Sequence, residues 1–239
     1  MKNVFLNNGF SHLSELVTFD EVENLRLIYD RLLTDKVKTA NLRSDLSGVV
    51  KDANKTEKIT QVMRPSLVEP SLLKNIVYKR ALQWAKELLG ADMLLDFDML
   101  INKAPYSDTP TPWHQDAAYW IALPDKRAVS CWIALDDVYE ENGCMWFIPK
   151  ENSNVLQHQN LPNGGALYCE TSLEYKAQCI PLSAGGCTFH DGFTLHFSKG
   201  NTTSSQRRAL ILNFRPKKMI QLEREQGVDH TGARTARQK

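Results

Sequence analysis

A run of strand-like sequence from Gly90 to about Phe214 constrains the fold of this 239-residue chain more than any other feature. Short stretches with the two-residue alternation of a β-strand are separated there by turn-forming segments such as Glu140-Glu141-Asn142-Gly143 and Ala184-Gly185-Gly186. Many short strands with this punctuation are typical of a sandwich or jelly roll. The strand candidates are Met93–Asn102, Trp113–Ile121, Ala128–Leu135, Cys144–Ile148, Gln178–Leu182, Cys187–His190 and Arg208–Phe214.

Two amphipathic helices are predicted ahead of this run, packed outside one sheet. Thr18 and Glu21 form a capping box for a helix over residues 19–34. Pro70 suits the first position of a second helix, and Gly90 suits its end. Residues 35–56 are polar and lack a period, so they are predicted as loop. The side chains expected to face the core are Val22, Leu25, Ile28, Tyr29 and Leu32 in the first helix and Leu73, Val77, Ala81, Trp84 and Leu88 in the second.

The pattern predicts one mainly β domain over residues 1–239. We expect a helical N-terminal part at about residues 1–90, a jelly-roll core at about 91–216 and a polar C-terminal tail. Residues 227–239 are basic and polar, a composition typical of disordered segments.

The charge balance excludes several classes of partner. Lys and Arg number 29 against 28 for Asp and Glu, so no global field attracts nucleic acid or an anionic membrane. The N-terminus lacks the apolar run of a signal peptide, and no later run reaches transmembrane length. We therefore expect a cytoplasmic protein that binds neither nucleic acid nor membrane, and its small-molecule substrate has to be argued from the site. The sequence predicts no particular oligomeric state.

The five cysteines, an odd number with no Cys-x-x-Cys pair, argue against a disulfide framework and against a thiolate zinc site. Most are expected to be buried thiols in a reducing compartment.

The motif His114-Gln115-Asp116 carries the strongest chemical signal. Successive side chains of a strand point to opposite faces, so His114 and Asp116 point the same way while Gln115 points the other. An imidazole and a carboxylate then converge on one point, and the fold must supply a third ligand. His196, in the later segment 194–198, offers it. Two histidines and one carboxylate on one face of an ion leave the other positions open, as in non-haem Fe(II) oxygenases.

At His114-Gln115-Asp116, His196 and Arg207 the chain resembles the phytanoyl-CoA dioxygenase family of Fe(II)- and 2-oxoglutarate-dependent oxygenases. The resemblance covers roughly residues 58–214, and its ordered set of motifs is far more specific than a lone His-x-Asp. The further matching positions are Met99-Leu100-Ile101-Asn102-Lys103 ahead of the motif, Trp132 eighteen positions after His114, Asn142-Gly143-Cys144 in the following turn, and Ser198 two positions after His196.

The resemblance implies a double-stranded β-helix in which His114, Asp116 and His196 hold Fe(II). It also implies 2-oxoglutarate and O2 as cosubstrates, with Arg207 paired to the distal carboxylate of 2-oxoglutarate. The residues that it places around this cosubstrate are Met99, Trp132, Ser198 and, upstream, Lys58.

An arginine suits the chemistry of this cosubstrate. A dicarboxylate that chelates a metal at one end needs a cation at the other, and a guanidinium forms two parallel bonds to a carboxylate. Arg207 is predicted on a strand that returns beside the His196 segment. The rival is Arg208, which points to the other face, and the family register favours Arg207.

The other histidines have less specific surroundings. His190 is the rival for the third ligand position, but the companions Ser198 and Arg207 select His196 and leave His190 beside the ligands or on the substrate side. The remaining histidines have no such companions and are expected to be solvent-exposed; they are His12, His158 and His230.

The expected reaction is hydroxylation of an unactivated C–H bond in a small molecule, with release of succinate and CO2. Asp116 is retained where related halogenases carry a small residue, which favours hydroxylation; desaturation and ring formation stay open as alternatives. Two other classes compete. Open coordination positions argue against a non-catalytic metal-binding jelly roll, and a cupin-type isomerase or hydrolase would have no use for Arg207 or Trp132.

The substrate itself is not encoded in a motif, and fold-level analogy does not choose it. CoA phosphates would call for a basic cluster, and Arg215, Lys217 and Lys218 form a small one, although such a run is usually a solvated face. The C-terminus carries no peroxisomal Ser-Lys-Leu address, which also favours a small metabolite over a fatty acyl-CoA. Four aromatic residues line a substrate pocket or, as we favour, pack in the core: Tyr106, Trp113, Tyr119 and Trp120.

Overall fold

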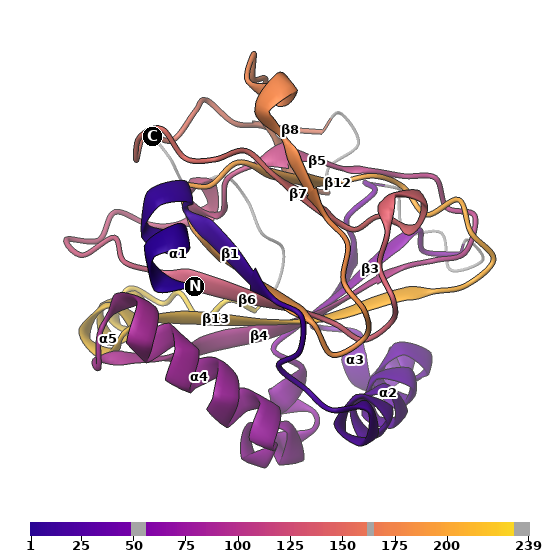
Figure 1. Ribbon diagram of the computed structural model, residues 1–239. Helices are drawn as coiled ribbons and strands as arrows, with labels where there is room; N and C mark the ends of the chain where they lie inside the picture. Colours follow the sequence, from indigo (N-terminus) through magenta and orange to yellow (C-terminus); the bar gives the residue numbers. More distant parts are fainter. Residues whose placement is uncertain (49–55, 162–164, 232–239) are drawn as a thin grey trace.

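The computed structural model describes residues 1–48, 56–161 and 165–231. In these residues two antiparallel sheets face each other, and helices cover the outer face of the larger sheet (Figure 1). The larger sheet has the strand order β1 (Phe10–Leu13), β11 (Cys187–Asp191), β6 (Val129–Ala134), β13 (Arg207–Pro216), β4 (Met93–Lys103), β3 (Ile59–Met63) and β2 (Arg43–Asp45). The smaller sheet has the order β10 (Gln178–Ile180), β7 (Met145–Phe147), β12 (His196–Ser198) and β5 (Thr111–His114). A separate pair joins β8 (Gln159–Asn160) and β9 (Leu167–Tyr168).

Helices α2 and α4 lie on the side of the larger sheet that faces away from the smaller one (Figure 1). The α-helices are α1 (Lys2–Asn8), α2 (Phe19–Thr34), α3 (Lys36–Thr39), α4 (Ile76–Leu89) and α5 (Lys217–Glu225). Short 3-10 turns are η1 (Pro65–Leu67), η2 (Pro70–Lys74), η3 (Asp116–Tyr119), η4 (Glu140–Asn142) and η5 (Glu174–Lys176). Within the described residues, no helix is both long and apolar enough to cross a membrane.

The larger sheet is buried on both faces, because its strands send alternate side chains into two separate cores. Leu100 of β4 and Leu210 of β13 join the core beneath the helices, with Val22 and Leu25 of α2. Their neighbours Met99 and Ile211 join the core between the two sheets. The second core is where the cavity described below opens.

Each of the seven strand candidates overlaps an observed strand, in the predicted order along the chain. The strand predicted over Trp113–Ile121 is much shorter than expected. Its strand ends at His114, and the chain then turns into η3, where Ala117 N donates to Gly192 O at 2.8 Å. The short strands β1, β2, β3, β8, β9 and β12 were not predicted.

The first predicted helix is confirmed over residues 19–34, with the capping box of Thr18 and Glu21 in place. The second is wrong at its start. Pro70 opens a 3-10 turn, and the α-helix begins only after Asn75, whose side chain accepts from Val77 N. Leu73 therefore lies outside the helix and is exposed, whereas Trp84 is half-buried against the core. The end at Gly90 is correct, because its N–H caps Lys86 O.

The proposed division into a helical N-terminal part and a β core needs correction. Strands β1, β2 and β3 precede residue 90 and form both edges of the larger sheet. The C-terminal tail also differs from the expectation, because it begins with helix α5, which contacts β4 and β13, and His230 farther on stacks on Phe97 of β4. Residues 49–55 of the predicted loop, the turn residues 163 and 164, and the tail from residue 232 lie outside the described residues.

A tight contact at Gly192 gives a stability prediction. A Cβ built on Gly192 would lie 1.8 Å from Cη2 of Trp120, and the ring of Trp120 also packs against the Arg215 guanidinium, whose carbon is 3.9 Å from the ring centroid. We expect Gly192→Ala to lower the free energy of unfolding by roughly 1–3 kcal/mol through overpacking, measured by urea denaturation. In a Trp120→Ala background the same substitution should cost far less. Equal costs in both backgrounds would contradict this account.

Candidate active site

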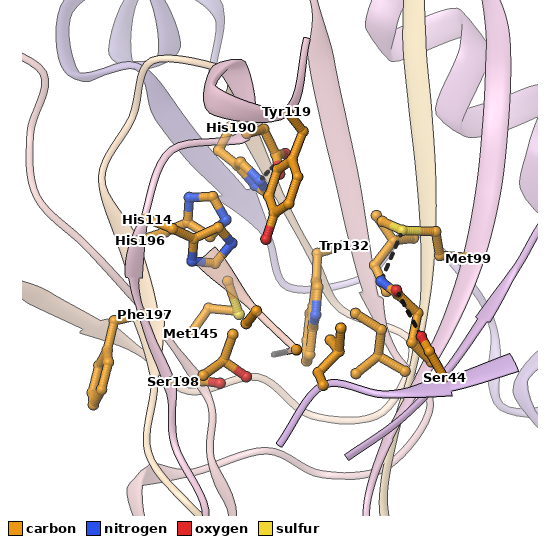
Figure 2. Close-up of a pocket in the computed structure, with 18 of the residues that line it drawn as sticks. Ser44, Met99, His114, Tyr119, Trp132, Met145, His190, His196, Phe197 and Ser198 are labelled. Carbon is orange, nitrogen blue, oxygen red and sulfur yellow. Dashed lines mark hydrogen bonds and ion pairs between the residues drawn. The ribbon is translucent and has the colours of Figure 1, made fainter. Parts of the chain in front are cut away.

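The two histidines of the motif set are direct neighbours across a strand pair. His196 of β12 lies opposite His114 of β5 in the antiparallel register, and their ring centroids are 4.1 Å apart. Directly opposed residues on one face have Cβ atoms about 4.5–5.5 Å apart. Register therefore brings together two residues that are 82 positions apart in sequence. Figure 2 shows their rings side by side at one end of the cavity.

Asp116 completes the set from the first residue of η3. Gln115 is extended, with φ −125° and ψ 132°, so Asp116 returns to the side of His114 as the alternation predicted. The Gln115 side chain points away and donates to the carbonyl oxygens of Asn154 and Phe193. One ligand-type atom each of His114, Asp116 and His196 lies within 4.8 Å of the others, and all three residues are largely buried.

Both imidazoles are oriented by their own main chain. His114 Nδ1 lies 2.8 Å from Pro112 O, and His196 Nδ1 lies 2.9 Å from Thr194 O. A carbonyl oxygen can only accept, so each Nδ1 carries the proton and each Nε2 presents its lone pair. Burial, together with the nearby His114 and His190, holds the pKa of His196 well below its usual range. The lowered pKa favours the uncharged form of the His196 imidazole.

The cavity beside these residues has a volume of about 180 Å³. It lies between the two sheets, and the Trp132 ring is part of its lining (Figure 2). Met99, Ile211 and Trp132 form one side as a row, because β13 pairs Ile211 with Met99 of β4 and with Trp132 of β6. Ser198, predicted to line the cosubstrate site, is two residues from His196 on the same face of β12 and lines the cavity.

Arg207 also lines this cavity, although its residue is only 1% exposed. Its guanidinium carbon is 5.4 Å from the centroid of the Trp132 ring. Its Nε and Nη1 are buried and have no hydrogen-bond partner among the described residues. Burial lowers the pKa of Arg207 to about 10, which still leaves it charged at neutral pH. A buried guanidinium without a carboxylate partner is costly to fold, so the site is built to receive an anion.

Lys103 is paired with Arg207 across the sheet, but its ammonium has other partners and is not assigned to the anion. Its ammonium donates to the carbonyl oxygens of Thr109, Ser198 and Lys199. These hydrogen bonds fix the end of β12. Burial and the charge of Arg207 hold the pKa of Lys103 well below its usual range. The rival Arg208 points away, as predicted, and pairs with Asp136 and Asp30.

Lys58 is the one predicted site residue that the structure does not bring to the cavity. Its side chain is exposed, and its N–H donates to Asp45 Oδ2 just before β3 begins. Gln61, three residues later, falls on the opposite face of the strand and lines the cavity instead. Its amide contacts Met99 Sδ at 3.4 Å and Ser44 Oγ at 3.5 Å (Figure 2).

The other aromatic and histidine expectations have mixed outcomes. Tyr119 lines the cavity, whereas Trp113 stacks on Phe197, Trp120 packs against Phe193, and Tyr106 is 71% exposed. His12 is exposed as expected.

The expectation of exposure is wrong for two histidines. His158 is half-buried and its Nε2 accepts from Gln115 N at 3.0 Å. His230 stacks on Phe97 with ring centroids 4.0 Å apart.

A second cluster of ligand-type residues, Asp96, Glu223 and His230, belongs to a buried ion network rather than to a metal centre. Arg215 lies 3.5 Å from Asp96 and 3.4 Å from Glu223, and Arg224 donates to Asp96. Burial alone would raise the pKa of Asp96, but His230 and the two arginines outweigh it and lower the pKa to about 2. Two guanidinium groups balance two carboxylates, so no further cation is needed.

This network also overturns the proposed basic cluster. Arg215 is buried against the two carboxylates and the Trp120 ring, while Lys217 and Lys218 alone are exposed.

Comparisons with known proteins agree with this geometry. The family model for phytanoyl-CoA dioxygenase matches residues 5–209. An ectoine dioxygenase of Streptomyces coelicolor is 26% identical over 227 residues, covering 87% of this chain and 74% of the relative. The peroxisomal phytanoyl-CoA dioxygenase of Mus musculus is 22% identical over 225 residues, covering 89% and 67%. EvdO2 from Micromonospora carbonacea var. aurantiaca, solved with 2-oxoglutarate, is 27% identical with a TM-score of 0.72, covering 89% of this chain and 88% of that one.

The fold and the site together define a 2-oxoglutarate-dependent non-haem iron dioxygenase with a jelly-roll core. Its cofactor is Fe(II), and its cosubstrates are 2-oxoglutarate and O2. The chain belongs to the phytanoyl-CoA dioxygenase family.

Proposed function

We propose that His114, Asp116 and His196 hold the Fe(II) and that Arg207 binds the distal carboxylate of 2-oxoglutarate. The enzyme then hydroxylates an unactivated C–H bond of a small molecule, with release of succinate and CO2. O2 is the oxidant: 2-oxoglutarate, oxidised to succinate and CO2, supplies two of the four electrons that reduce it, and the substrate C–H bond supplies the other two. Bound Fe(II) would activate the O2 for this reaction, and the protein supplies binding, orientation and exclusion of water.

The observation that carries the proposal is the buried guanidinium of Arg207, whose Nε and Nη1 have no hydrogen-bond partner among the described residues, in the cavity that the three ligand residues also line. A five-carbon diacid has one end for the metal and one for this cation. An arginine suits the second role because its fork matches both oxygens of a carboxylate. A structural metal protein or a cupin-type isomerase gives this arginine no purpose.

The other lining residues have separate parts in cosubstrate binding. The Trp132 ring lies beside the guanidinium and limits its movement, so that the fork faces the cavity. Ser198 offers a hydroxyl from the strand that carries His196. Met99 and Ile211 provide apolar walls that exclude water from the carbon chain of the diacid. We assign no cosubstrate contact to Lys58.

A small substrate without phosphate groups fits this cavity better than an acyl-CoA. Among the described residues, Arg207 is the one Lys or Arg side chain in the lining, and it is reserved for the cosubstrate. CoA phosphates would call for a basic cluster, and in the short run Arg215, Lys217 and Lys218 the arginine is buried, so only the two lysines of that run are exposed. The relative named for ectoine supports a small-molecule substrate within the same family.

The test is a screen for substrate-stimulated succinate release with Fe(II), ascorbate and 2-oxoglutarate. We expect one class of small metabolite to raise the rate and to gain one oxygen atom by mass spectrometry, while fatty acyl-CoA thioesters do not. Product formation without consumption of 2-oxoglutarate would indicate an isomerase or hydrolase. Stimulation by acyl-CoA alone would refute the proposed substrate class.

A further inference from the structure

The carboxylate of Asp116 is held from behind by side chains of the opposite sheet. Ser130 Oγ lies 2.9 Å from Asp116 Oδ2, and His190 Nε2 lies 3.4 Å from the same oxygen. We infer that Ser130, His190 and Asn213 are positioning residues that fix this carboxylate for the metal. The inference rests on the proposed role of Asp116 as a metal ligand.

Strand register places the three residues in one row. Ser130 on β6 is directly opposite His190 on β11 and directly opposite Asn213 on β13. Directly opposed residues of a sheet share a face, so all three side chains point into the space between the sheets. None is more than 9% exposed. The row therefore meets Asp116, which comes from the segment that follows β5 of the other sheet.

The number of available protons determines which group donates in each hydrogen bond of this row. Ser130 Oγ lies 2.9 Å from Asp116 Oδ2 and 2.7 Å from the Asn213 side-chain oxygen, but a hydroxyl has only one proton to donate. The Asn213 amide nitrogen has no partner among the described residues. Exchanging the two ends of the amide satisfies Ser130, since the nitrogen then donates to Ser130 Oγ and the single Ser130 proton goes to Asp116.

The three metal ligands are thus oriented by different means. His114 and His196 are fixed by carbonyl oxygens two residues back in their own chain segment. Asp116 sits at the start of a 3-10 turn, and the row supplies the bond that prevents its carboxylate from rotating about the Cβ–Cγ bond. Partners behind a metal ligand typically contribute 10–100-fold to metal affinity or activity.

The experiment measures Mn(II) binding to the metal-free full-length protein, by electron paramagnetic resonance of the unbound ion. We expect Ser130→Ala to raise the Kd for Mn(II) about 10–100-fold and Ser130→Thr, which keeps the hydroxyl, to restore it. Asn213→Leu should give a smaller rise, because Ser130 keeps its bond to Asp116. Thr188→Val is the matched control, since it removes a buried hydroxyl without a described partner two residues from His190.

Two results would overturn the inference. One is a Kd for Ser130→Ala equal to that of the wild type. The other is a rise in Thr188→Val as large as in Ser130→Ala, because that would indicate general loosening of the core. Failure of the wild type itself to bind Mn(II) would instead refute the proposed metal centre. Unfolding midpoints of the metal-free variants identify any that do not fold. If Ser130→Ala does not fold, the Kd of Asn213→Leu for Mn(II) is the test instead.

Discussion

Asp116→Ala should abolish the iron-dependent conversion of 2-oxoglutarate to succinate. Loss of a partner behind a metal ligand already costs about 10–100-fold, so loss of a ligand should cost more than about 100-fold in succinate release. The remaining pair, His114 and His196, would leave the ion with two protein ligands at a site that is built for three. The assay is succinate release at saturating 2-oxoglutarate and a fixed excess of Fe(II).

Asp125→Ala is the control, since it removes a carboxylate that pairs with Arg127 and does not line the cavity. It should retain wild-type turnover. A variant of Asp116 with full turnover would contradict the assignment of this residue as a ligand, and the same substitution at His190 would then decide whether that neighbour takes the position.

Much of this site could be predicted because its signals are local. The spacing of His114 and Asp116 needs only the alternation of extended backbone, and that alternation holds through Gln115 even though the strand ends at His114. Alternation also predicted that Arg207 and Arg208 face opposite sides of the sheet, and the family resemblance then favoured Arg207 as the one that faces the site.

Sequence reasoning expected His190 beside the ligands but missed Ser130 and Asn213, because their place depends on register between distant strands. Ser130, His190 and Asn213 form a row only because β6 lies between β11 and β13, and no periodicity along the chain contains that information. The prediction that Lys58 contacts the cosubstrate has a related weakness. An upstream position was carried over from the family motif, whereas the parity of β3 places Gln61 in the cavity.

Errors in the helical and terminal regions come from side-chain partners. Pro70 is a good first residue for a helix, but the Asn75 side chain caps Val77 N, and the α-helix starts at Ile76, six residues after Pro70. His230 and Arg215 looked exposed by composition, yet together with Asp96 and Glu223 they form one buried ion network. Such charge pairing becomes visible only when the elements have been packed together.

The second large effect is expected at the opposite end of the cosubstrate. Arg207→Ala should raise the KM for 2-oxoglutarate by roughly 30-fold to several thousand-fold, because removing one partner of a desolvated charge pair costs about 2–5 kcal/mol. The turnover number at saturating 2-oxoglutarate should fall less, since the three metal ligands are untouched. Arg207→Lys should have a KM for 2-oxoglutarate between those of the wild type and Arg207→Ala, because an ammonium offers one point of charge where the guanidinium offers two parallel bonds.

Arg208→Ala is the matched control for this substitution. It breaks the ion pairs with Asp30 and Asp136 on the other face of the same strand, so it should lower stability and leave the KM for 2-oxoglutarate unchanged. The assignment would be wrong if Arg207→Ala kept the wild-type KM for 2-oxoglutarate while Arg208→Ala or Lys58→Ala raised it. The residue whose substitution raised the KM would then be the one that binds the distal carboxylate. The buried guanidinium would then need another anion, because the described residues provide it with no carboxylate partner.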